Sequence, residues 1–136
     1  MSTGLLIITH NQVGAELLAT ATAMLGKCPL NARVLPVTTA CDPEELQRRA
    51  ALMIAALEQG GGVIILTDMY GSTPANIAKT LQQAHEQVDV ITGINLPMLV
   101  RLLNYPHLGR PQLMAKALSG GREGIFACSN GDDGDS

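Results

Sequence analysis

The sequence predicts an α/β fold in which helices cover both faces of a parallel sheet. Short, nearly continuous apolar runs, typical of strands buried on both faces, alternate along the chain with stretches of helical periodicity. Ala, Leu, Ile and Val are abundant whereas only 2% of the residues are aromatic, a composition that suits helices packed on a buried sheet. We expect one domain over residues 1–129 and an acidic disordered tail over residues 130–136.

The first half of the chain contains three of the expected strands. Strands are expected at residues 4–9, 33–38 and 63–67, with helices at residues 12–25 and 43–58 between them. Pro36 cannot donate a ladder hydrogen bond, so the second strand belongs at a sheet edge or a bulge. The second helix has Asp42 as its N-cap, Pro43 in the first helical position and Glu45 where a capping box requires it.

The second half continues the alternation and fixes the expected strand order. It contains a helix from Pro74 to about Glu86, a strand at residues 88–92, a helix in "GINLPMLVRLLN", a helix near residues 112–118, and a short last strand, "GIFAC", at residues 124–128. With the Pro36 strand at one edge, the simplest sheet has the order 2-1-3-4 and right-handed crossovers. The first and third strands then flank the topological switch point, where open α/β sheets bind ligands beyond the carboxyl ends.

Two side chains with complementary chemistry stand at this switch point. His10 follows the first strand, and Asp68 follows the third strand, so the two are expected to be neighbours. A neutral imidazole is a nucleophile, and a carboxylate that holds one ring nitrogen fixes the tautomer and stabilises a cationic ring. The pair is therefore suited to receive and release a phosphoryl group.

The stretch "TDMYGSTPAN" adds a cradle for the anion. Thr73 is expected to be the N-cap of the following helix, because Pro74 suits the first helical position. Backbone amides from Ala75 onward, with the hydroxyl groups of Ser72 and Thr73, can hold phosphate oxygens at a helix N-terminus. No metal or cofactor is needed for this chemistry.

Other readings of these residues stay open at the level of pattern. A histidine after a strand is often a loop residue, and an aspartate there is often only a helix cap. A flavodoxin-like module that binds an anion or a partner without covalent chemistry would keep the same crevice. His85 and His107 have no recognisable partner.

The chain has no P-loop lysine pattern, no G-x-G-x-x-G after the first strand and no G-x-S-x-G elbow, so a phosphate relay is favoured over a nucleotide-dependent kinase.

Charge and cysteine content exclude further classes. The formal charge is −3, and Asp132, Asp133 and Asp135 of the tail account for it. The body is thus neutral, without the basic stripe that binding to nucleic acid requires. No apolar run approaches the roughly 20 residues of a membrane span, and the N-terminus lacks the pattern of a signal peptide. Three cysteines without a CxxC spacing suggest buried thiols and a cytoplasmic location.

The motifs together resemble the mannose-type IIA domains of the bacterial sugar phosphotransferase system. The resemblance rests on "IITH", "TDMYGSTPAN" and "GINLPMLVRLL", which occur in the family's order and spacing from Gly4 to about Cys128. It implies that His10 is phosphorylated by the phosphocarrier HPr and passes the group to a IIB component or a regulatory acceptor. Asp68 matches the acidic residue that holds the active histidine, and Thr73 the small hydroxyl residue near the phosphate.

The resemblance also implies an assembly. Family members form homodimers that exchange a C-terminal strand, here "GIFAC", and contact the membrane only through a transporter complex. Met69, Tyr70, Leu96 and Met98 lie on loops near the site and are candidates for partner docking, with a core role as the alternative. A related group donates phosphate within dihydroxyacetone kinases.

The family often has Gly where this chain has Asn11, and Gly-Gly where this chain has Gly71-Ser72. Asn tolerates left-handed backbone angles, so the loop after His10 is expected to keep its shape.

Overall fold

The computed structural model describes residues 2–131 and contains one parallel sheet of four strands. The strands are β1 (Gly4–His10), β2 (Ala32–Val37), β3 (Val63–Thr67) and β4 (Val88–Thr92). Their order is β2-β1-β3-β4, all neighbours being parallel. The predicted order 2-1-3-4 is therefore confirmed, and the ends of β1 and β3 lie side by side.

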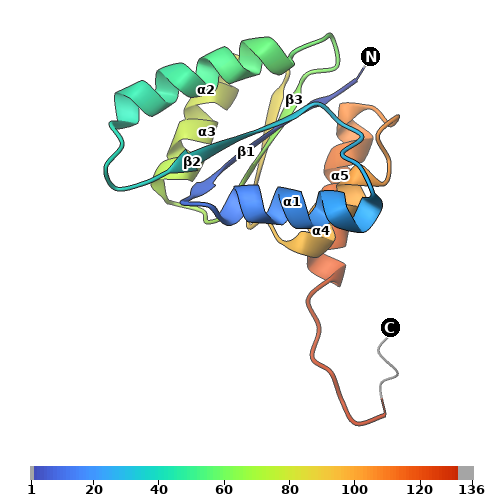
Figure 1. The fold of residues 1–136 in the computed structure, drawn as a ribbon. Helices are drawn as coiled ribbons and strands as arrows, with labels where there is room; N and C mark the ends of the chain where they lie inside the picture. The colour runs from blue at the N-terminus through green and yellow to red at the C-terminus, as the bar shows by residue number, and fades with distance from the viewer. Residues whose placement is uncertain (1, 132–136) are drawn as a thin grey trace.

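Helices cover both faces of the sheet (Figure 1). One face carries α1 (Val13–Leu25), α4 (Leu96–Leu103) and α5 (Arg110–Glu123), and the other carries α2 (Pro43–Leu57) and α3 (Thr73–Ala84). Successive β1 side chains alternate between two buried clusters: Leu5 and Ile7 pack with the first group of helices, Leu6 and Ile8 with the second. This alternation directs the side chain of His10 to the α2 and α3 face.

The edge position of β2 explains how a strand accommodates Pro36. Among residues 2–131 the strand pairs with β1 alone, and Pro36 lies opposite Thr9 in the register. An edge strand has one side without a ladder, so the missing N–H leaves no partner unsatisfied there. The edge placement expected from Pro36 is confirmed.

The start of α2 differs in one detail from the expected capping box. Asp42 is the N-cap, and its Oδ1 accepts a hydrogen bond from the N–H of Glu44 at 3.2 Å. Pro43 begins the helix as predicted. Glu45 forms an ion pair with Arg48, one turn along the helix, so the predicted role of Glu45 in a capping box is wrong.

Helix α5 is about twice as long as expected because two glycines lie inside it. Gly120 and Gly121 resemble a helix end in the sequence, yet both belong to α5. A Cβ at Gly120 would lie 2.7 Å from the Cβ of Arg101, and one at Gly121 would lie 2.8 Å from the Cε of Met98. The glycines therefore allow α5 to approach α4 closely, and this packing outweighs their low helix propensity.

The predicted last strand at residues 124–128 does not form within the part of the chain that the structure describes. After α5, residues 125–129 have no regular structure, and the segment extends away from the helices (Figure 1). The side chains of Ile125 and Phe126 are 75% and 55% exposed. Exchange of the "GIFAC" segment between subunits stays a prediction. Asp132, Asp133 and Asp135 of the predicted tail lie outside the described residues.

No helix in the described part of the chain has the length and apolar character to cross a bilayer.

Candidate phosphoryl-transfer site

His10 and Asp68 meet at the carboxyl ends of β1 and β3. Ile8 lies opposite Thr67 in the register, so the residues that follow converge at one edge. The Nδ1 atom of His10 lies 2.9 Å from Oδ2 of Asp68. The backbone N–H of His10 donates to the same oxygen at 3.1 Å. A single carboxylate oxygen thus holds both the ring and the main chain of the histidine.

This contact fixes the protonation pattern of the ring. An ionised carboxylate only accepts hydrogen bonds, so Nδ1 carries the proton and Nε2 of a neutral ring keeps its lone pair. The His10 side chain is 45% exposed and the Asp68 side chain 17%. Oδ1 of Asp68 is buried and has no hydrogen-bond partner among the described residues. Oδ2 is therefore the carboxylate oxygen that Asp68 presents to the imidazole.

A left-handed residue turns the chain immediately after the histidine. Asn11 has φ 47°, a region that Asn enters more readily than most residues. Its N–H donates to the carbonyl oxygen of Val37 at 2.8 Å. The turn from β1 into α1 is thus closed, as expected for Asn in place of Gly.

The start of α3 lies one residue earlier than predicted. Ser72 is the N-cap and Thr73 is the first helical residue. Thr73 as N-cap is wrong, because the Asn76 N–H donates to the Ser72 carbonyl oxygen at 2.9 Å and so places the helix start. Ser72 Oγ donates to the carbonyl oxygen of Met69 at 2.6 Å, which leaves the helix without a side-chain cap. Ala75 is completely buried, so its amide contributes to the positive helix end rather than to the surface.

A cavity of about 420 Å³ opens beside the histidine. His10, Asn11 and Thr73 line it on one side. The opposite wall runs from the end of β2 through the following turn into α2 and consists of Val37, Thr38, Thr39, Cys41, Pro43 and Leu46. This wall was not predicted from the sequence, and the Cys41 thiol was expected to be buried in the core. The predicted strand order could have revealed this wall, because β2 lies next to β1 and the residues after its carboxyl end must lie near His10.

Cys41 has a perturbed thiol at this wall. Its Sγ lies 3.2 Å from Oγ1 of Thr38, and its N–H donates to the Thr38 carbonyl oxygen. The hydrogen bonds with the side chain and the backbone of Thr38 lower the pKa of the Cys41 thiol, with a smaller contribution from the charge of Arg49.

The four candidate docking residues divide into two groups. Met69 and Tyr70 are 63% and 73% exposed, next to Asp68 in the chain, and Leu96 is half-buried. The Nζ atom of Lys79 lies 5.6 Å from the centre of the Tyr70 ring. Met98 is 4% exposed and packs in the core beneath α5. The docking role of Met98 is therefore wrong, and its alternative reading as a core residue applies.

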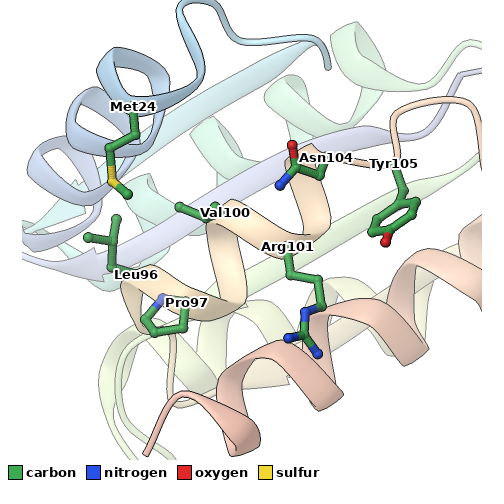
Figure 2. A pocket seen from close by; sticks show the side chains of 7 residues that line it. All are labelled: Met24, Leu96, Pro97, Val100, Arg101, Asn104 and Tyr105. Carbon is green, nitrogen blue, oxygen red and sulfur yellow. The ribbon is translucent and has the colours of Figure 1, made fainter. Parts of the chain in front are cut away.

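A second hollow lies on the α1 and α4 face. Figure 2 shows Met24 of α1 opposite α4, across a groove of about 400 Å³. Leu96, Pro97, Val100, Arg101, Asn104 and Tyr105 complete its lining. Neither His10 nor Asp68 lines this groove. No group of three potential metal-ligating side chains occurs within residues 2–131.

Comparison with known proteins assigns the chain to a family. Residues 4–107, which include His10 and the whole α3 start, match the EIIA-man family, described as the PTS system fructose IIA component. Over 131 residues, covering 93% of this chain, the sequence is 32% identical to the PTS system mannose-specific EIIAB component of Escherichia coli K12. The chain spans 40% of the length of that relative. It is also 25% identical over 87 residues to the PTS system fructose-specific EIIA component of Bacillus subtilis.

A solved structure agrees in fold. The mannose/sorbose specific IIA subunit from Enterococcus faecalis superposes with a TM-score of 0.86, covering 97% of this chain and 98% of that chain, at 21% sequence identity. This likeness concerns the fold. The match of residues 4–107 carries the assignment, and the chain belongs to the EIIA-man family of phosphotransferase-system IIA components.

Proposed function

We propose that His10 is the phosphoryl carrier of this IIA component, loaded by phospho-HPr and unloaded by a IIB-type acceptor or a regulatory acceptor. The observation that carries the proposal is the double contact of His10 with Oδ2 of Asp68, at 2.9 Å from Nδ1 and 3.1 Å from the backbone nitrogen. It leaves Nε2 as the free nucleophile of a half-exposed ring that lines a cavity.

The transfer step follows from this geometry. The Nε2 lone pair of His10 attacks the phosphorus of the donor phosphohistidine, and an Nε2–P bond forms. The donor N–P bond breaks, and its electron pair stays on the donor nitrogen. The proton on Nδ1 remains in its hydrogen bond with Asp68, so the phosphorylated ring is charge-balanced. In the second transfer the Nε2–P bond breaks, and its pair returns to Nε2 while the acceptor nucleophile takes the phosphoryl group.

The N-terminus of α3 supplies the positive potential for the phosphate. Thr73 lines the cavity with His10, and Ser72 stands at the N-cap. Helix N-termini favour anions because their first N–H groups have no intrahelical acceptor. We expect the phosphoryl oxygens to contact the hydroxyl group of Thr73 and the Ser72–Thr73 amides, with Ala75 contributing through the helix dipole.

Partner docking is expected around the cavity mouth. Met69 and Tyr70 present apolar surface beside Asp68, and a transient relay contact needs only a modest interface. We also expect a cytoplasmic homodimer, since Ile125 and Phe126 leave an apolar segment uncovered in the single chain. Light scattering on the intact chain and on a variant with Ile125 and Phe126 changed to Ser checks the second point: the variant should be monomeric.

The relay is tested by intact mass after incubation with phosphoenolpyruvate, enzyme I and HPr. Wild type should gain one acid-labile phosphoryl group, as should His107→Gln, a matched change at an exposed histidine. His10→Gln should gain none. If wild type gains nothing while HPr is shown to be phosphorylated, the relay from HPr is refuted and a non-covalent anion-binding module becomes the better account.

A further inference from the structure

One buried hydroxyl group joins the end of β1 to the start of α1. Thr9 is 0% exposed, and the strand alternation puts its side chain on the face of β1 opposite to His10. Its Oγ1 accepts a hydrogen bond from the N–H of Gly14 at 2.7 Å. The same hydroxyl donates to the carbonyl oxygen of His10 at 3.2 Å. Thr9 thus contacts both the helix and the main chain of the proposed phosphoryl carrier.

The hydroxyl replaces the missing cap of α1. Gln12 is the N-cap residue, and its side chain makes no capping hydrogen bond. The first N–H groups of a helix need acceptors from outside the helix, and Gly14, the second residue of α1, is buried. Thr9 provides that acceptor from three residues before the N-cap.

The close approach that permits this bond depends on Gly14. A Cβ at Gly14 would lie 3.0 Å from Oγ1 of Thr9 and 2.6 Å from Cγ2 of Ile7. Real Cβ atoms avoid such contacts, so any larger residue would push α1 away from β1. The hydroxyl–amide contact is therefore part of the packing that sets the distance between helix and strand.

The main chain of His10 is held at three successive points. Its N–H is bound to Asp68, its carbonyl oxygen to Thr9, and the next N–H, of Asn11, to the Val37 carbonyl oxygen. Oδ2 of Asp68 takes both the backbone N–H and Nδ1. A shift of the His10 backbone would therefore lengthen both bonds and release the tautomer.

We propose that Thr9 is a positioning residue for phosphoryl transfer at His10: its hydroxyl group fixes the backbone so that Nδ1–H meets Asp68 and Nε2 stays free. This inference rests on the proposed function, and it adds a residue on the face of the sheet away from the cavity. Displacement of a reacting group by about 1 Å can cost roughly 10²-fold in rate.

The test compares isosteric variants by two measurements. Thr9→Val removes the hydroxyl group and keeps the shape, whereas Thr9→Ser keeps the hydroxyl group. Thr3→Val is the matched control, because Thr3 is also buried and its Oγ1 has no partner among the described residues. Imidazole ¹⁵N NMR of His10 reports the tautomer, and single-turnover transfer from phospho-HPr reports the rate.

We expect wild type, Thr9→Ser and Thr3→Val to show the Nδ1–H tautomer and similar rates. Thr9→Val should show a mixture of tautomers and a rate lower by about tenfold or more. If Thr9→Val is less stable but keeps the wild-type tautomer and rate, Thr9 is only a helix cap and the proposal is overturned. Failure of Thr9→Ser to retain the tautomer would overturn it too.

If Thr9→Val does not fold, Thr9→Cys, with a weaker donor and acceptor, gives the same comparison, and an unchanged tautomer there overturns the proposal. If wild type accepts no phosphoryl group, the proposed function fails, but the tautomer comparison still decides whether Thr9 positions His10.

Discussion

Replacing Asp68 by Asn removes one charge at the site with almost no change in shape. In the structure, Oδ2 of Asp68 accepts hydrogen bonds from the backbone N–H and from Nδ1 of His10. Asn keeps one acceptor oxygen but loses the charge. The NH₂ group of Asn takes the place of Oδ1 of Asp68, which is buried and has no hydrogen-bond partner among the described residues. The fold should therefore survive Asp68→Asn.

The size of the effect follows from the two hydrogen bonds. A bond to a charged group contributes about 1.5–3 kcal/mol, and one between neutral groups about 0.5–1.5 kcal/mol. Losing the charge thus removes about 2–3 kcal/mol over both bonds, and each tenfold change in rate corresponds to roughly 1.4 kcal/mol. A slowing of about 30- to 150-fold is expected, nearer the lower end because the His10 side chain is 45% exposed.

The assay is single-turnover transfer from phospho-HPr, followed by intact mass, with urea unfolding on the same samples. Asp89→Asn is the matched control, because Asp89 accepts a 2.7 Å hydrogen bond from Nε of Arg110 near the amino end of β4, away from the site. It should lose some stability and keep the transfer rate. If Asp68→Asn transfers within about threefold of wild type, the carboxylate does not prepare His10, and the reasoning is refuted.

Two further changes test the core and the cavity wall. Leu99 of α4 is 0% exposed and belongs to the buried cluster on the α1, α4 and α5 face of the sheet. Leu99→Ala should therefore lower the free energy of unfolding by about 2–5 kcal/mol. A loss below about 1 kcal/mol in urea unfolding would contradict the packing described. The lowered pKa of Cys41 depends mainly on Thr38, and a lower pKa means more thiolate at a given pH. Iodoacetamide should therefore modify Cys41 at lower pH in wild type than in Thr38→Val, and coincident pH profiles would contradict that cause.

The arrangement of the sheet could be predicted because it depends on local rules. Apolar runs mark the strands, and the missing N–H of Pro36 places β2 at an edge. Parallel strands end at one edge of the sheet, so His10 and Asp68 were expected to meet, and the structure brings them to 2.9 Å.

The remaining features depend on tertiary packing and could not be predicted in this way. Gly120 and Gly121 end a helix in most contexts but here continue α5, because α4 lies against them. Met98 follows a loop motif and looks available for docking, yet α5 covers it. The hydroxyl of Thr9 has a role only because a helix that starts four residues later returns its amide to within 2.7 Å. Such contacts are set by how elements meet in space.

The sharing of one oxygen by the ring and the backbone of His10 has a kinetic meaning. If His10 is the phosphoryl carrier proposed above, these two contacts keep its ring in one orientation, and donor and acceptor should approach Nε2 along the same path. Under the proposed function the two partners take turns, and the relay is a double-displacement reaction with parallel lines in a double-reciprocal plot. Unphosphorylated HPr should then compete with the acceptor for the phosphorylated protein. A higher ratio of free to phosphorylated HPr would therefore slow phosphoryl transfer to the acceptor.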